Sequence, residues 1–110
     1  MSITHIVLFQ FKADVSNDAI SDTINHMTAL KDNCIHPQSQ NPYIRSLSGG
    51  LDNSKEGIQH GITHVFVAEF ASAEDRDYYV NEDPAHLAFV KSVGGIAEKV
   101  QVIDFTDGVF

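Results

Sequence analysis

Two nine-residue segments of this chain repeat each other. Residues 3–11 read ITHIVLFQF and residues 62–70 read ITHVFVAEF, so the Ile, Thr, His and final Phe are identical. Both segments are rich in β-branched and aromatic residues and contain no Gly or Pro, which is typical of strands. Each is followed by a polar stretch and then by a helical pattern. Two such halves within 110 residues predict an α+β, ferredoxin-like βαββαβ fold with an antiparallel sheet.

Three helix starts are marked by capping residues. Ser16 or Asn17 precedes a first helix, and its apolar stripe comprises Ile20, Ile24, Met27 and Leu30. Ser72 precedes a second helix that runs to about Val80. Asp83 with Pro84 directly after it begins a third, because proline fits the first helical position.

The other two strands give weaker signals. Residues 43–48 form a short predicted strand, which we expect to end at Gly49 and Gly50. Residues 99–105 form the last predicted strand. Gly94 and Gly95 end or kink the third helix, and residues 96–97 could prolong it.

The strands are apolar on both faces. Val7 and Phe9 share a face with His5, whereas Ile6 and Leu8 lie on the opposite face, and the second repeat has the same alternation. Helices can cover only one face of a four-stranded sheet. The second apolar face therefore predicts contact with another sheet, most simply in a homodimer.

Charge and cysteine content exclude several protein classes. The formal net charge is −8, which opposes binding to nucleic acid or to an anionic membrane surface. No apolar run reaches the roughly 20 residues of a membrane span, and the N-terminus lacks the basic region of a secretory leader. Cys34 is the single cysteine and has no partner for an internal disulfide. We therefore expect one domain, residues 1–110, in the cytoplasm.

Ionisable residues near strand ends indicate a candidate pocket. His5 and His64 occupy equivalent places in the two repeats, and Asp104 lies on one face of the last predicted strand. An imidazole titrates near neutral pH and serves as a general acid or base, which a carboxylate can orient. The alternative is that each histidine is a half-buried structural residue. The one pair of histidines with a spacing close to that of metal ligands, His60 and His64, straddles the boundary between a loop and a strand, so we predict no metal.

Three segments resemble the stress-responsive dimeric α/β-barrel (Dabb) family. They are Thr4–Lys12, Thr63–Val65 and Asp83–Phe89, and their order and spacing extend over nearly the whole chain. The resemblance implies a ferredoxin-like protomer whose sheet joins that of a second subunit in a dimeric barrel. Some family members are plant stress proteins of unclear chemistry, and one is a polyketide cyclase.

The resemblance to the cyclase member also implies site residues. His86 would be the general acid or base, with Tyr79 or the adjacent Tyr78 as its hydrogen-bonding partner. The cyclase has a histidine directly before its proline where this chain has Asp83. The residues expected to bind the substrate are His5, Val7, Phe9, His64, Phe66, Phe89 and Asp104.

These observations leave more than one function open. The favoured hypothesis is a cofactor-free enzyme with polyketide cyclase, aldolase or lyase-like acid–base chemistry on a small hydrophobic or aromatic carbonyl compound. The alternative is a non-catalytic stress-responsive dimer that holds a hydrophobic ligand. A cofactor-independent monooxygenase is a third possibility, but no residue pattern indicates oxygen chemistry.

Overall fold

The computed structural model describes all 110 residues. Its four strands and three helices occur in the order β1 (Ile3–Phe11), α1 (Asn17–Asn33), β2 (Ile44–Leu51), β3 (His64–Phe70), α2 (Ala73–Asn81), α3 (Pro84–Val93) and β4 (Ala97–Phe105).

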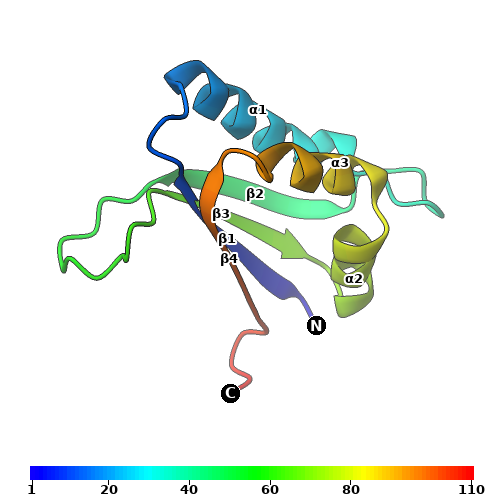
Figure 1. Cartoon of the computed structure of the whole chain (residues 1–110). Helices are drawn as coiled ribbons and strands as arrows, with labels where there is room; N and C mark the ends of the chain where they lie inside the picture. The colour runs from blue at the N-terminus through cyan, green and yellow to red at the C-terminus, as the bar shows by residue number, and fades with distance from the viewer.

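The strands form one sheet in the order β2-β3-β1-β4, and every neighbouring pair is antiparallel. The two repeated segments lie side by side, with Ile3 opposite Phe70 and Phe9 opposite His64. All three helices cover the same face of the sheet, as Figure 1 shows. The predicted ferredoxin-like α+β fold is confirmed.

The predicted helix starts are confirmed as well. Ser16 caps α1, and its hydroxyl accepts a hydrogen bond from the Ala19 amide at 3.1 Å. Ser72 caps α2 in the same way. Asp83 caps α3, with Pro84 in the first turn. Each cap satisfies amides that the first turn of a helix leaves without partners.

Two predicted boundaries were wrong. β2 continues through Gly49 and Gly50 to Leu51, because the absent side chain of Gly49 lets this strand lie against the ring of Phe66. A Cβ at position 49 would lie 2.7 Å from the Val65 carbonyl oxygen. Residues 96–97 do not prolong α3, since β4 begins at Ala97 after a turn.

The two faces of the sheet differ in burial. His5, Val7 and Phe9 lie on the helix side and are buried. On the opposite face, Ile6 and Leu8 are only half-buried, and the neighbouring β4 is more open: Ile103 and Phe105 are each 46% exposed. One protomer thus covers one apolar face and leaves the other uncovered (Figure 1).

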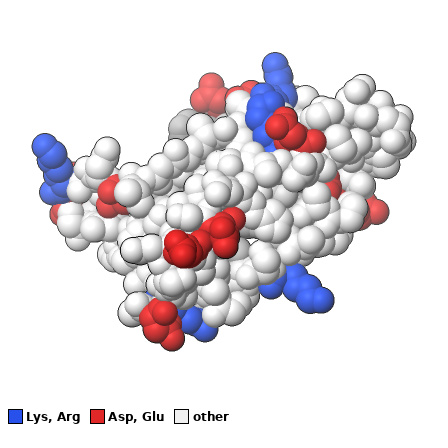
Figure 2. Space-filling model, turned by 90° about the horizontal axis from the view of Figure 1, so that it is seen from above, with Lys and Arg blue, Asp and Glu red and all other residues white.

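None of the three helices combines the length and apolar character needed to cross a membrane. Figure 2 shows the face covered by the helices, on which the Lys and Arg side chains stand apart from one another.

Candidate acid–base site

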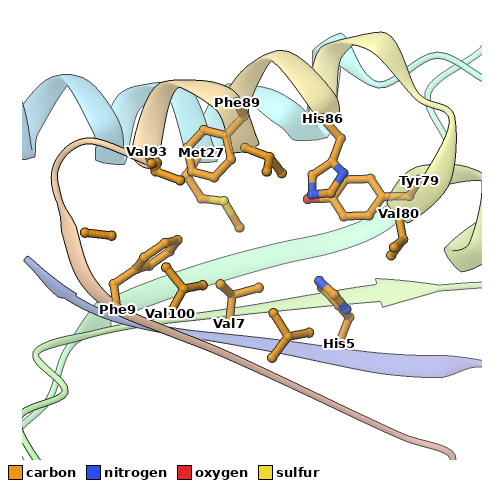
Figure 3. A pocket seen from close by; sticks show the side chains of 14 residues that line it. His5, Val7, Phe9, Met27, Tyr79, Val80, His86, Phe89, Val93 and Val100 are labelled. Carbon is orange, nitrogen blue, oxygen red and sulfur yellow. The ribbon is translucent and has the colours of Figure 1, made fainter.

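A cavity of about 490 Å³ lies between the β1–β4 half of the sheet and helices α2 and α3 (Figure 3). Pockets for small organic molecules have volumes of this order. Eleven of the 14 lining residues are hydrophobic. The full lining is His5, Val7, Phe9, Met27, Tyr79, Val80, His86, Phe89, Val90, Val93, Gly94, Ala97, Val100 and Val102.

Most of the predicted site residues meet at this cavity. Those that line it are His5, Val7, Phe9, Tyr79, His86 and Phe89. Asp104 does not line it but lies directly behind His5, to which it is hydrogen-bonded. Segments from both halves of the chain therefore build one site.

The structure places His64 and Phe66 elsewhere. They line a second, smaller cavity of about 210 Å³, together with Ile24 of α1 and glycines of β2. The ring of Phe9 contacts both Phe66 and Phe89 edge to face. The two repeats therefore present their histidines to different spaces, because β1 lies next to β4 whereas β3 lies next to β2.

The structure distinguishes the two adjacent tyrosines. Tyr79 is 1% exposed and its ring stacks on that of His86, with the centroids 3.8 Å apart. Tyr78 instead contacts His36 and Tyr43, away from the cavity. Consecutive residues of a helix point about 100° apart, so only one of the pair can face the cavity.

His86 is positioned by the start of α3. The Asp83 carboxylate accepts hydrogen bonds from the amides of Ala85 and His86, and its other oxygen accepts one from the Tyr43 hydroxyl. Asp83 is 1% exposed. This carboxylate therefore ties α3, and with it His86, to the residue before β2.

The imidazole of His86 is in an apolar environment. Its Nδ1 atom is buried and has no hydrogen-bonding partner. Burial lowers the pKa of His86 below its usual value. The backbone carbonyl of Tyr79 lies nearby and offsets part of this effect, but it does not form a hydrogen bond with Nδ1. A neutral imidazole is the form that can accept a proton. Burial also raises the pKa of the Tyr79 hydroxyl, so Tyr79 remains a hydrogen-bond donor.

His5 has a different environment at the same end of the cavity. Its Nδ1 atom lies 2.6 Å from Oδ1 of Asp104, its cross-strand neighbour on β4. The second oxygen of Asp104 accepts a hydrogen bond from Arg76 of α2 at 2.9 Å. His5 thus has a carboxylate partner, whereas His86 has none.

Sequence reasoning missed several of these residues. Val100 and Val102 line the cavity, and their alternation with Asp104 along β4 was the signal that could have identified them. No local pattern pointed to Arg76, since its partner Asp104 lies 28 residues further along the chain.

No group of three or more His, Cys, Asp or Glu side chains is arranged to bind a metal ion. Cys34 is fully buried, and burial raises its thiol pKa to about 12.

Comparisons with known proteins agree with this architecture. The profile of the Stress responsive A/B Barrel Domain (Dabb) matches residues 3–107. The Stress-response A/B barrel domain-containing protein HS1 of Arabidopsis thaliana is 33% identical over 103 residues, which are 94% of this chain and 87% of that protein. The crystal structure of At3g17210 from Arabidopsis thaliana has 31% identity and a TM-score of 0.82, with 98% of this chain and 97% of that one covered.

More distant structures share the fold. The hydroxynitrile lyase of Passiflora edulis is 24% identical with a TM-score of 0.81, and the match covers 99% of this chain and 96% of that one. A dimeric ferredoxin-like protein from Thermobifida fusca is 20% identical with a TM-score of 0.72, covering 96% and 91%. From the profile match and the identity to HS1, this chain belongs to the stress responsive A/B barrel domain (Dabb) family.

Proposed function

We propose that this protein is a small-molecule enzyme of the lyase or polyketide cyclase kind, which works by acid–base chemistry without a cofactor. The observation that carries the proposal is the environment of His86. Its ring lines an apolar cavity, has a buried nitrogen without a partner, and is held neutral by burial. A general base needs this combination of access to the ligand and an unprotonated nitrogen.

The chemistry follows from the two stacked rings. A ring nitrogen of His86 removes a proton from a carbon next to a carbonyl, or from the hydroxyl of a carbonyl adduct. The electron pair left behind then forms or breaks a carbon–carbon bond. The Tyr79 hydroxyl, whose end of the ring reaches toward the cavity interior in Figure 3, donates a hydrogen bond to the substrate oxygen.

The lining limits the substrate class. Only His5, Tyr79 and His86 bring polar side chains to the cavity, and they come from one end of it, whereas aliphatic and aromatic side chains line the rest. The expected ligand is a hydrophobic or aromatic compound with one carbonyl or hydroxyl end. The lyase from Passiflora edulis, whose name describes such a substrate, supports testing hydroxynitriles first.

The experiment compares purified wild-type protein with His86→Gln on a panel of aromatic and aliphatic hydroxynitriles, with released cyanide as the readout. Loss of a general base lowers kcat by about 10²–10⁴-fold. Tyr78→Phe is the matched control, since this tyrosine lies outside the cavity. Equal turnover by wild type and His86→Gln would refute the proposal.

A non-catalytic ligand-binding role is the second candidate, and the observation that favours it is the largely apolar lining. Calorimetry with aromatic hydroxy-acids distinguishes the two. Binding that is unchanged in His86→Gln, in a protein that turns over no member of the panel, would favour simple ligand storage.

We also propose that the protein is a cytoplasmic homodimer. The uncovered sheet face, with Ile6, Leu8 and Phe105, provides the apolar surface for a second copy, and the neighbour from Thermobifida fusca is described as dimeric. The buried, unpaired Cys34 supports a reducing compartment.

A further inference from the structure

The main cavity is open along one side, and this opening is lined by apolar side chains. On the inner side of the cavity, Phe9 and Phe89 are 1% and 3% exposed. Four valines that line the same cavity are instead between 38% and 53% exposed. These four residues, here called the valine rim, are Val80 of α2, Val90 of α3, and Val100 and Val102 of β4.

The strand order explains why this side is open. β4 is an edge strand, and its extensive contacts are with β1 rather than with any helix. Val100 and Val102 lie on the helix side of the sheet, opposite Phe9 and Val7 of β1, so they border the cavity without a helix above them. The fold therefore leaves an apolar strip beside the cavity that no element of the protomer covers.

An ion pair bridges the opening at the polar end of the cavity. Nη1 of Arg76 on α2 lies 2.9 Å from Oδ2 of Asp104 on β4, and Asp104 is the cross-strand neighbour of His5. Figure 3 shows Val80 beside Tyr79 at this end and Val100 beside Phe9 toward the other. The part of the opening without a bridge therefore lies away from the polar groups, between Val90 and Val100.

The cavity is long in comparison with a compact ligand. From His5 to Phe9 the strand β1 runs along its floor, and four residues of strand span about 13 Å. A one-ring compound with its oxygen beside His86 would leave the remaining apolar walls in contact with water. No Asp, Glu, Lys or Arg lines the cavity, so nothing there would bind a charged tail.

The shape of the opening favours a narrow chain over a protein surface. Its walls belong to α3 on one side and β4 on the other, and the rim valines of both walls line one continuous space with the interior. A folded partner would contact only the edges of such a cleft, whereas an alkyl or aryl chain can lie between the walls. Apolar atoms removed from water on both surfaces would stabilise the complex.

We propose that the valine rim is part of the ligand site and that the ligand is amphipathic. Its oxygen-bearing end lies at His86 and Tyr79, and its uncharged apolar tail runs along the cavity to the opening between Val90 and Val100. The proposal rests on the proposed function for the position of the oxygen-bearing end. It narrows the substrate class from hydrophobic carbonyl compounds in general to those with a long tail.

A homologous series of ligands tests the tail site without any turnover. The probes are linear methyl ketones of increasing chain length, which carry one carbonyl and no other polar group, and the readout is Kd by calorimetry. We expect the affinity of the wild type to rise by about threefold to fourfold for each added CH₂ group until the tail passes the rim.

The rim variants are Val90→Thr and Val100→Thr, which keep the branched shape and add a hydroxyl group. We expect each to weaken the binding of long-chain ketones by about threefold to tenfold and to leave short ones unaffected, because only long tails desolvate the new hydroxyl. Leu87→Thr is the matched control, since Leu87 is 43% exposed on the same helix but does not line the cavity.

Two results would overturn the proposal. One is a Kd that does not depend on chain length, or that depends on it equally in the wild type and the rim variants. The other is a fall in molar mass to that of a monomer in Val90→Lys, measured by light scattering, since a second copy of the chain would then cover the rim. We expect the mass of Val90→Lys to equal that of the wild type.

The two proposals fail separately. If affinity rises with chain length as expected but no hydroxynitrile is turned over, the proposed function fails and the ligand class stands. If hydroxynitriles are turned over in a manner that requires His86, while ketone affinity ignores the tail, the proposed function stands and the tail site is refuted.

Discussion

At the scale of single residues, the two histidines of the cavity differ in their hydrogen-bonding partners. Both rings are largely buried at the same apolar cavity, but only His5 has a carboxylate partner. Burial lowers the pKa of His86, so its imidazole resists protonation. Identical side chains thus acquire different chemistry from their neighbours.

The lowered pKa of His86 predicts a pH dependence of stability. The unfolded chain protonates this histidine near its ordinary pKa of 6.5, whereas the folded protein does so only at lower pH. As the pH falls through 6.5, the unfolded state binds more protons, so the free energy of unfolding decreases. We expect His86→Gln to lose less stability than the wild type between pH 7.5 and pH 5.5, in urea unfolding at one protein concentration.

His64 serves as the comparison for that measurement. Burial lowers the pKa of His64 as well, but this residue lies at the second cavity and is less deeply buried than His86. A pH dependence that persists in His86→Gln and disappears in His64→Gln would show that the effect was assigned to the wrong histidine.

At the scale of elements, the start of α3 and the middle of β2 depend on single residues. Asp83 caps α3 and also accepts the hydrogen bond of Tyr43. The family cyclase has a histidine at this position, and the structure shows that an aspartate serves here as a cap. β2 pairs with β3 from Ile44 to Leu51, and at Gly49 the absence of a side chain leaves room for the ring of Phe66.

A pair of glycine substitutions tests the packing of β2. Gly49→Ala places a methyl group against Phe66 and the Val65 carbonyl, whereas a Cβ at Gly50 meets nothing within 4 Å. Overpacking of this kind costs about 1–3 kcal/mol. We expect thermal denaturation to show a clearly lower Tm for Gly49→Ala than for the wild type, and a nearly unchanged Tm for Gly50→Ala. Similar Tm values for the two variants would contradict the close approach.

At the scale of the whole molecule, one apolar face of the sheet is not covered by any element of the same protomer. Its centre comprises Ile6, Leu8, Val65 and Val67, and all four are half-buried in one protomer. Apolar surface of this kind gains roughly 25 cal/mol for each Å² removed from water. Association with a second copy would provide that burial.

A charge on this face should therefore separate the subunits. We expect Leu8→Lys to change the molar mass in light scattering from that of a dimer to that of a monomer, because a buried lysine without a partner is costly. Leu87→Lys on α3 is the control, since Leu87 is 43% exposed on the helix side. A Leu8→Lys protein that remains dimeric would place the interface elsewhere.

Local patterns in the sequence were sufficient for much of the fold. The repeat identified β1 and β3, the caps identified the three helices, and the alternation along β1 indicated two apolar faces. These features depend on residues close together in the chain, where propensity and periodicity act. β2 was underestimated because glycines usually interrupt strands, and here Gly49 serves close packing instead.

The site depended more on tertiary structure. The strand pattern identified His5 and His64 as candidates, and the family resemblance implied Tyr79, His86 and Phe89, but the strand order placed His64 at the second cavity, apart from the others. Only the packing of α2 distinguished Tyr79 from Tyr78 and brought Arg76 to Asp104. Residue type, local periodicity and the family resemblance thus determined which groups were candidates, whereas contacts between distant segments decided which of them share a cavity, since no local pattern encodes the distance between two elements.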